Sequence, residues 1–260
     1  MLRFLKNLAI ILTVGYLLIC VLLYSFQEKL LFHPFPLDAT ERVAGEEVRI
    51  PVADGIDLSA VWLRAPNARG ALLYFHGNTG NLRRCSYQAQ RALTGHGYDV
   101  LVVDYRGFGK SAGALRHEDD LLLDAERVYE YVRRSYPEDR IAVLGYSLGS
   151  GPATHVAHQF DPQQLFLVAP YRSIPRVVRD YRIPVPSFLV KYPLRNEDKL
   201  PDVDCPVTIA HGTRDNVIPY AQGEFLGQLP GVDFHRFEGT SHRGIILSAE
   251  LRRLIGRRLR

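Results

Sequence analysis

The sequence predicts an α/β protein with a mostly parallel, doubly wound sheet flanked by helices, a small lid insertion and one N-terminal transmembrane helix. Three features of its 260 residues predict this class. Apolar runs of four or five residues suit strands that are buried on both faces of a parallel sheet. Amphipathic stretches lie between these runs, and such alternation favours right-handed crossovers within one sheet. A long uncharged segment stands at the start of the chain.

Residues 1–30 are predicted to be a short cytoplasmic stub and a transmembrane signal anchor. Residues 7–27 carry no charged side chain, and about 20 apolar residues suffice to cross the hydrocarbon core. The run is longer than the apolar region of a secretory signal and lacks an A-x-A cleavage pattern, so an anchor is favoured over a cleaved signal peptide. Arg3 and Lys6 precede the run, which places the N-terminus in the cytoplasm and the body on the extracytoplasmic side. Residues 31–44 contain the proline-punctuated FHPFP and are predicted to be a linker at the membrane surface.

The body, residues 45–260, is predicted to be one domain. Glu47–Ile50 and Leu58–Leu63 flank an Asp54-Gly55 turn and are expected to form a hairpin. Strands buried on both faces are expected at Ala71–Phe75, Val100–Val103, Ile141–Leu144, Leu165–Val168 and Val207–Ala210.

Helices are predicted between these strands. Leu82–Leu93 is one, and Glu118–Tyr136 is clearer because its apolar residues fall on one face and Pro137 follows it. Residues 170–206 interrupt the alternation and are rich in proline, arginine and tyrosine. We expect this segment to form a small lid over the edge of the sheet.

The positive charge of the chain lies mostly in its tail. The net charge is +4 at pH 7, and five arginines fall within the last nine residues. The rest of the chain is therefore close to neutral, which argues against nucleic acid as a partner. A solvated helix end is favoured for the tail, with a contact to anionic lipid as the alternative.

The cysteines predict neither a metal site nor any other cofactor site. Cys20, Cys85 and Cys205 are far apart and lack the spacing of metal ligands. Buried free thiols are favoured for Cys85 and Cys205, with a disulfide between them as the alternative.

The segment GYSLGS at residues 145–150 directly follows an apolar run that is predicted to be a strand. Glycine weakens a strand, but a tight strand-to-helix turn requires it. Residues 145–149 match G-x-S-x-G, the nucleophile elbow, whose strained turn exposes a serine hydroxyl. Ser147 is therefore the candidate nucleophile. The alternative is an ordinary tight turn with a capping serine.

A serine hydroxyl needs a base to take its proton and a carboxylate to orient that base. After an elbow, the chain order of these groups is serine, acid, histidine. Asp215 follows the predicted strand Val207–Ala210, and His242 follows Phe234–Phe237 and is expected to open the final helix. We therefore predict Asp215 and His242 as the partners of Ser147. His211 is expected to be a core histidine with its hydrogen bonds satisfied.

The tetrahedral intermediate of acyl transfer needs two preorganised N–H donors. One is expected from Leu148, the residue after the nucleophile, and the other from the loop after Ala71–Phe75. That loop reads HGNTG, so Asn78 is the predicted second donor, and Gly77 lets the backbone approach a substrate closely. The alternative is a glycine-rich loop that only turns the chain.

The motifs YFHGNTGN, DYRGFGKSAG, GYSLGSG, HGTRDNVIP and GTSH, in this order, resemble the α/β-hydrolase superfamily. More narrowly, they resemble the membrane-anchored Bem46-like and α/β-hydrolase-domain group, which is related to S33 serine aminopeptidases. The resemblance covers about residues 45–250. It implies that Ser147, Asp215 and His242 form a triad and that residues 104–107 shape the wall of the site. Substrate contacts are expected from Gly77, Tyr105 and Tyr146.

The favoured function is a membrane-anchored serine hydrolase that cleaves carboxylic ester or thioester bonds of a small or lipid-like acyl substrate. A serine peptidase of the aminopeptidase kind is the first alternative, and a non-enzymatic membrane-bound binding platform is the second. Residues 172–195 of the lid include six basic side chains. They are expected to form a solvated face, with a contact to anionic headgroups as the alternative.

Overall fold

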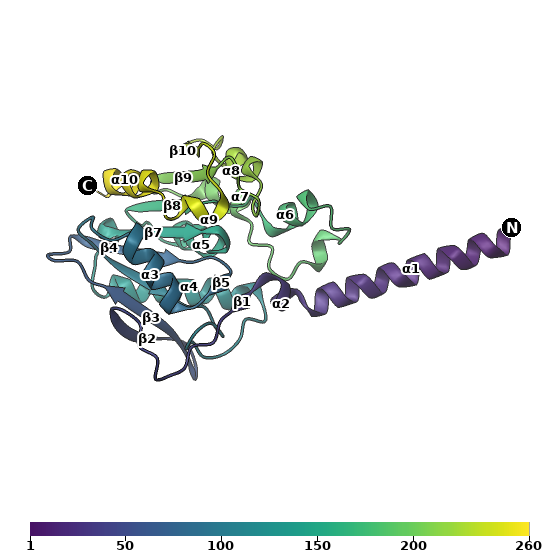
Figure 1. The fold of residues 1–260 in the computed structure, drawn as a ribbon, viewed down its shortest axis with the longest axis horizontal. Helices are drawn as coiled ribbons and strands as arrows, with labels where there is room; N and C mark the ends of the chain where they lie inside the picture. Colours follow the sequence, from purple (N-terminus) through teal and green to yellow (C-terminus); the bar gives the residue numbers. More distant parts are fainter. Residues whose placement is uncertain (260) are drawn as a thin grey trace.

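An eight-stranded sheet runs through the body in the order β10-β9-β8-β7-β4-β6-β3-β2 (Figure 1). The structure is a computed structural model and describes residues 1–259. All neighbours from β10 to β6 are parallel, whereas β3 is antiparallel to both β6 and β2. The mostly parallel sheet and the N-terminal hairpin are thus as predicted. The strands are β2 Glu46–Ala53, β3 Ile56–Leu63, β4 Gly70–Phe75, β6 Tyr98–Val103, β7 Ile141–Tyr146, β8 Gln164–Val168, β9 Val207–Gly212 and β10 Val232–Phe237.

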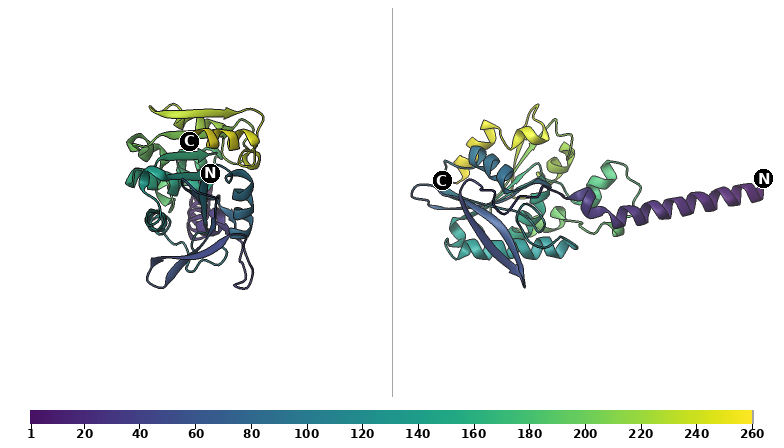
Figure 2. Two further views of the ribbon diagram at one scale, coloured as in Figure 1. Left: turned by 90° about the vertical axis from the view of Figure 1, so that its left-hand side faces the viewer. Right: turned by 60° about the horizontal axis from the view of Figure 1, so that its bottom comes forward.

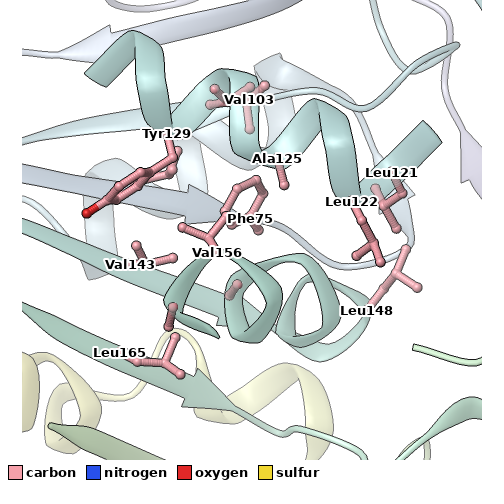
Figure 3. Packing of buried hydrophobic residues seen from close by; sticks show 14 of the residues in the cluster. Phe75, Val103, Leu121, Leu122, Ala125, Tyr129, Val143, Leu148, Val156 and Leu165 are labelled. Atoms are coloured by element: carbon pink, nitrogen blue, oxygen red, sulfur yellow. The ribbon is translucent and has the colours of Figure 1, made fainter. Parts of the chain in front are cut away.

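Helices cover both faces of the sheet because alternate residues of each central strand point to opposite sides. In β4, Leu73 and Phe75 pack with α4 (Glu118–Arg133) and α5 (Ser150–Gln159), as Figure 3 shows for Phe75. Leu72 and Tyr74 pack on the other side with α3 (Leu82–Ala92) and α10 (Ala249–Arg258). The two buried faces explain why these strands read as continuous apolar runs.

The N-terminal helix α1 (Leu2–Ser25) projects away from the body (Figures 1 and 2). Its mean hydropathy reaches 2.5 over 18 residues, and only 6% of that window is buried. Twenty-four residues span about 36 Å as a helix, more than the roughly 30 Å of a hydrocarbon core. By length and composition, α1 is a candidate membrane anchor.

Residues 31–44, predicted to be a linker at the membrane surface, pack against the body. After α2 (Gln27–Leu31), strand β1 (His33–Pro34) pairs with β5 (Thr79–Gly80), and Phe32 and Leu37 are buried. The ring of Phe32 lies edge-on to Tyr192 of the lid, with centroids 4.9 Å apart. Apolar side chains within the proline-rich segment hold it against the body.

The lid, residues 170–206, contains α6 (Ile174–Asp180), α7 (Asn196–Lys199) and single 3₁₀ turns at Ser187–Leu189 and Leu200–Asp202. Its two ends are joined, because the Asn196 amide donates to the carbonyl of Tyr171 at 2.9 Å. The middle of the lid lies on the side of the body from which α1 leaves, whereas α10 lies on the opposite side (Figures 1 and 2).

All three cysteines are buried and free, which agrees with the favoured prediction over a Cys85–Cys205 bridge. Burial raises the pKa of the Cys205 thiol to about 12. Two predicted helix ends differ from the structure. α4 ends at Arg133 rather than at Tyr136, and His242 opens only the one-turn helix α9 (His242–Ile245), which is separate from α10. The remaining helix of the body is α8 (Tyr220–Leu226).

Candidate active site

Ser147 stands at the end of β7, where a 3₁₀ turn (Ser147–Gly149) leads into α5. Its φ of +52° lies in the left-handed region, which is uncommon for a residue with a Cβ. Gly149 lets this turn close, since a Cβ there would collide with the carbonyl of Phe75 in β4. The sequence G-x-S-x-G therefore forms the strained turn that was predicted from it.

His242 and Asp215 lie beside this serine. Nε2 of His242 is 3.0 Å from Oγ of Ser147, and Nδ1 of His242 is 2.7 Å from Oδ2 of Asp215. Ser147, Asp215 and His242 follow β7, β9 and β10 in turn. The carboxyl ends of these parallel strands meet at one edge of the sheet, which brings the three residues together. The three side chains thus form a continuous hydrogen-bonded chain.

Asp215 is fully engaged at both carboxylate oxygens. Oδ1 accepts the backbone N–H groups of Val217 and Ile218, both at 2.8 Å. Oδ2 lies 3.3 Å from Nε2 of His211 in addition to its contact with His242. Burial by itself would raise the pKa of Asp215, but hydrogen bonds from the two histidines and from Val217 hold that pKa well below its usual range.

His211 is the site residue that sequence reasoning placed only in the core. It is fully buried, and its Nε2 lies 3.1 Å from the carbonyl of Ile218. Its Nδ1 has no hydrogen-bond partner among the described residues, so the expectation that its hydrogen bonds are satisfied is only half right. A carbonyl can only accept, so Nε2 carries the proton and can be shared with Asp215. The signal in the sequence is the i, i+4 spacing of His211 and Asp215 across a strand end, which is too common to point to a contact.

Two backbone N–H groups are free beside Ser147. Those of Asn78 and Leu148 donate no hydrogen bond within residues 1–259. The loop of Asn78 is tied to the N-terminal segment, because its side chain donates to the carbonyl of Leu31 at 2.9 Å and its own carbonyl accepts from His33 at 2.8 Å. Leu148 adjoins the serine in the chain, and the Asn78 loop approaches it, since a Cβ on Gly77 would lie 3.7 Å from the Cβ of Ser147.

An apolar cavity of about 280 Å³ opens onto this group. Ser147, Leu148 and Asn78 are among the residues that line it. The N-terminal helices contribute Leu23, Gln27, Leu30 and Leu31. The lid contributes mostly aliphatic side chains, among them Ile174, Val177, Val178, Ile183, Val185 and Val190.

Comparison with known proteins agrees with the fold. A family model described as "Serine aminopeptidase, S33" matches residues 66–192. The uncharacterized protein Rv2307c of Mycobacterium tuberculosis is 31% identical over 221 residues, which cover 80% of this chain and 76% of that protein. The chain belongs to the α/β-hydrolase superfamily.

This α/β hydrolase is also similar to a protein named lysophosphatidylserine lipase ABHD12. The Xenopus tropicalis protein is 28% identical over 71% of this chain, and the match covers 56% of its own length. The chain thus spans a little over half the length of these curated relatives. The esterase Pf2001 of Pyrococcus furiosus has the same fold, with a TM-score of 0.69 at 21% identity over 87% of this chain and 98% of that one.

The residues predicted to contact substrate surround the site of the hydrolase without lining the cavity. Gly77, Tyr105 and Tyr146 are not part of the cavity lining. Tyr105 lies beneath the loop, where its hydroxyl donates to the carbonyl of His76 at 2.5 Å. Tyr146 donates to the carbonyl of His242 at 3.0 Å. Both tyrosines are buried by the loops that they support, so they position the site rather than line it.

A buried polar pair supports the same loop from below. Nε2 of His76 lies 3.2 Å from Oδ1 of Asp104, and both side chains are inaccessible to solvent. The other oxygen of Asp104 accepts the N–H of Leu82 at the start of α3. This pair joins the loop after β4 to the loop after β6, so residues 104–107 act through the Asn78 loop.

Proposed function

We propose that the chain is a membrane-anchored serine hydrolase that cleaves carboxylic ester or thioester bonds of lipid-like acyl substrates. One observation carries this proposal: Ser147 lines an apolar cavity, and its hydroxyl contacts the imidazole of His242. A polar reactive group in the wall of an apolar pocket suits an acyl chain whose carbonyl must be attacked.

The proposed reaction is a two-step acyl transfer. The oxygen of Ser147 attacks the carbonyl carbon while His242 takes its proton, and Asp215 holds the imidazolium in place. The backbone N–H groups of Asn78 and Leu148 bind the oxyanion. His242 returns the proton to the leaving alcohol or thiol, which departs from the acyl-enzyme. His242 then activates a water molecule, which attacks the acyl-enzyme, releases the acid and restores Ser147.

The lipid-like substrate is supported by the cavity and by one group of relatives. Most residues that line the cavity are aliphatic, which suits an acyl chain better than a polar ligand. The related ABHD12 proteins are named lysophosphatidylserine lipases. Their name supports a lipid ester as the class of substrate of this chain.

We further propose that α1 spans the membrane, with the N-terminus in the cytoplasm and the hydrolase domain on the other side. Arg3 and Lys6 at the start of α1 support this orientation through the positive-inside rule.

The family model names aminopeptidases, so a peptidase is the second candidate. A site for a peptide amino terminus needs an acidic partner for the ammonium group. Among the described residues, those that line the cavity include no aspartate or glutamate. The lining therefore favours an ester or thioester over an aminoacyl amide.

The test compares ester and amide hydrolysis by the full-length protein in detergent. p-Nitrophenyl esters from acetate to palmitate, an acyl thioester and aminoacyl p-nitroanilides are assayed beside Ser147→Ala. We expect hydrolysis of esters or thioesters that is lost in the variant. Hydrolysis of the anilides alone would replace the proposal with a peptidase, and failure of a fluorophosphonate to label Ser147 would refute a serine hydrolase altogether.

A further inference from the structure

The wall of the cavity includes the end of the N-terminal helix. Leu23 in the last turn of α1, and Gln27, Leu30 and Leu31 in α2, line the same space as Ser147. These residues belong to a segment, residues 23–31, that we call the juxtamembrane segment. A helix that only tethers the domain is not expected to line a cavity that includes the nucleophile.

The juxtamembrane segment is also bonded to the lid. The Gln27 amide donates to the carbonyl of Leu189 at 2.6 Å, and its oxygen accepts the N–H of Lys191 at 2.9 Å. Nζ of Lys191 lies 3.0 Å from Glu28 and 4.5 Å from the centroid of the Tyr24 ring. Gln27 thus pairs with the lid backbone through both its donor and its acceptor. These two hydrogen bonds fix the position of the juxtamembrane segment relative to the lid, and both segments line the cavity.

The lid extends along α1. A second hollow between them is lined by Tyr16 of α1 and by lid residues that include Arg179, Arg182 and Ile183. Tyr16 precedes the end of α1 by nine residues, about 14 Å along the helix axis. If α1 spans a bilayer, this part of the lid reaches the depth of the headgroups or the outer acyl chains.

The exposed side chains of the lid suit that depth. Phe188 is 85% exposed, and Ile183 and Tyr181 are about half exposed. Arg179 and Arg182 line the same hollow as Ile183. Apolar and aromatic side chains with neighbouring arginines are the composition that binds the interface of an anionic membrane.

From these contacts we propose that the juxtamembrane segment forms part of the substrate site and that the acyl chain enters from the bilayer beside α1, between the anchor and the lid. The inference rests on the proposed hydrolase function. It specifies in addition that the acyl chain lies against the juxtamembrane segment and that it enters from the membrane rather than from water. The substrate would then be a lipid-like ester in the same membrane as the protein.

The contribution of the juxtamembrane segment to the substrate site is tested with alkyl fluorophosphonates of short and long chain. These probes react with an activated serine whatever the natural leaving group. Leu23→Trp fills the cavity from the helix side. Leu22→Trp is the matched control, because Leu22 is half exposed and does not line the cavity. We expect the long-chain probe to label Leu23→Trp at least about tenfold more slowly than wild type, the scale of a misfit in an apolar pocket. The short-chain rate should fall far less, and Leu22→Trp should follow wild type with both probes.

Two outcomes overturn different parts of this account. Equal chain-length dependence in Leu23→Trp and Leu22→Trp, with wild type labelled at Ser147, would overturn the inference and leave the hydrolase intact. No labelling of wild type at Ser147 would overturn the hydrolase and the inference together.

The route of entry is tested with the full chain reconstituted in vesicles. A lipid ester too insoluble to exchange is placed either in the vesicles that hold the protein or in protein-free vesicles, and a short soluble ester serves as the internal standard. We expect hydrolysis of the lipid only when it shares the membrane with the protein. Equal rates in the two arrangements, relative to the soluble ester, would overturn entry from the bilayer.

Discussion

The imidazole of His211 lies 3.3 Å from the carboxylate of Asp215, at the same oxygen that meets His242. His211 leaves the end of β9, and Asp215 lies in the loop that follows, so the strand itself sets their separation. With the two backbone N–H groups at its other oxygen, the carboxylate has four donors. This environment fixes the orientation of the group that holds His242.

His211 is therefore expected to be a positioning residue. His211→Phe keeps a planar ring and removes the donor, so Asp215 would be held by one contact fewer. We expect kcat for a short ester to fall by about tenfold, the loss typical of a removed orienting partner, with KM little changed because His211 does not line the cavity.

The matched variant is His211→Gln, whose amide supplies a donor at a similar reach. Recovery of most of the lost kcat is expected. If Phe and Gln reduce kcat equally, the effect comes from packing and the positioning role is wrong.

Asp215→Asn is expected to lower kcat by about 10⁴-fold, since an amide favours the wrong tautomer of the histidine. It should also change the dependence of stability on pH. The pKa of Asp215 is held below its unfolded value of about 3.9. Its carboxylate therefore stabilises the native state above that pH and loses this effect as pH falls towards the native pKa.

The measurement is the unfolding midpoint of wild type and Asp215→Asn in detergent across acidic pH. The difference should be constant above about pH 5 and should shrink below about pH 4. A difference that grows on acidification would mean that the carboxylate is not held in its charged form.

Gly149→Ala is expected to destabilise the protein by about 3 kcal/mol, because the added Cβ meets backbone atoms of Phe75 and His76 that cannot move independently. Gly77→Ala is the control for stability, since the nearest atom to its Cβ would be 3.4 Å away in the Tyr146 ring. Thermal unfolding of both variants checks this. Similar midpoints for the two would show that the elbow has room that the structure does not give it.

Cys205 is expected to be unreactive in the folded protein. Its pKa is raised by burial to about 12, above the unfolded value of about 8.5. The neutral thiol thus favours the native state below about pH 8.5, and this contribution is lost as pH rises towards 12. The difference in unfolding midpoint between wild type and Cys205→Ala should be flat below pH 8.5 and decline above it. A thiol reagent at pH 8 should modify Cys205 only after denaturant is added, and rapid modification of the native protein would contradict the buried neutral thiol.

The positions of the central strands and the three residues of the hydrogen-bonded chain could be predicted because each has a local signal. Double-sided burial produces apolar runs, an elbow needs glycine on both sides of its serine, and an acid and a histidine after later strands must meet at the edge where parallel strands end. The contacts of Tyr105 and Tyr146 could not be predicted in this way. Each tyrosine lies within a motif, yet the direction of its side chain depends on the loop packed above it.

The amino-acid sequence by itself determined the class of fold, the apolar N-terminal helix and the identities of Ser147, Asp215 and His242, because period, composition and motif are local properties of the chain. Only the tertiary structure decided that His211 supports Asp215, that residues 31–44 pack on the body, and that Leu23 and Gln27 share a cavity with Ser147. These contacts depend on how segments distant in the sequence pack together, or on the direction of a single side chain. No periodicity or motif encodes them, since they arise when the sheet brings distant loops together.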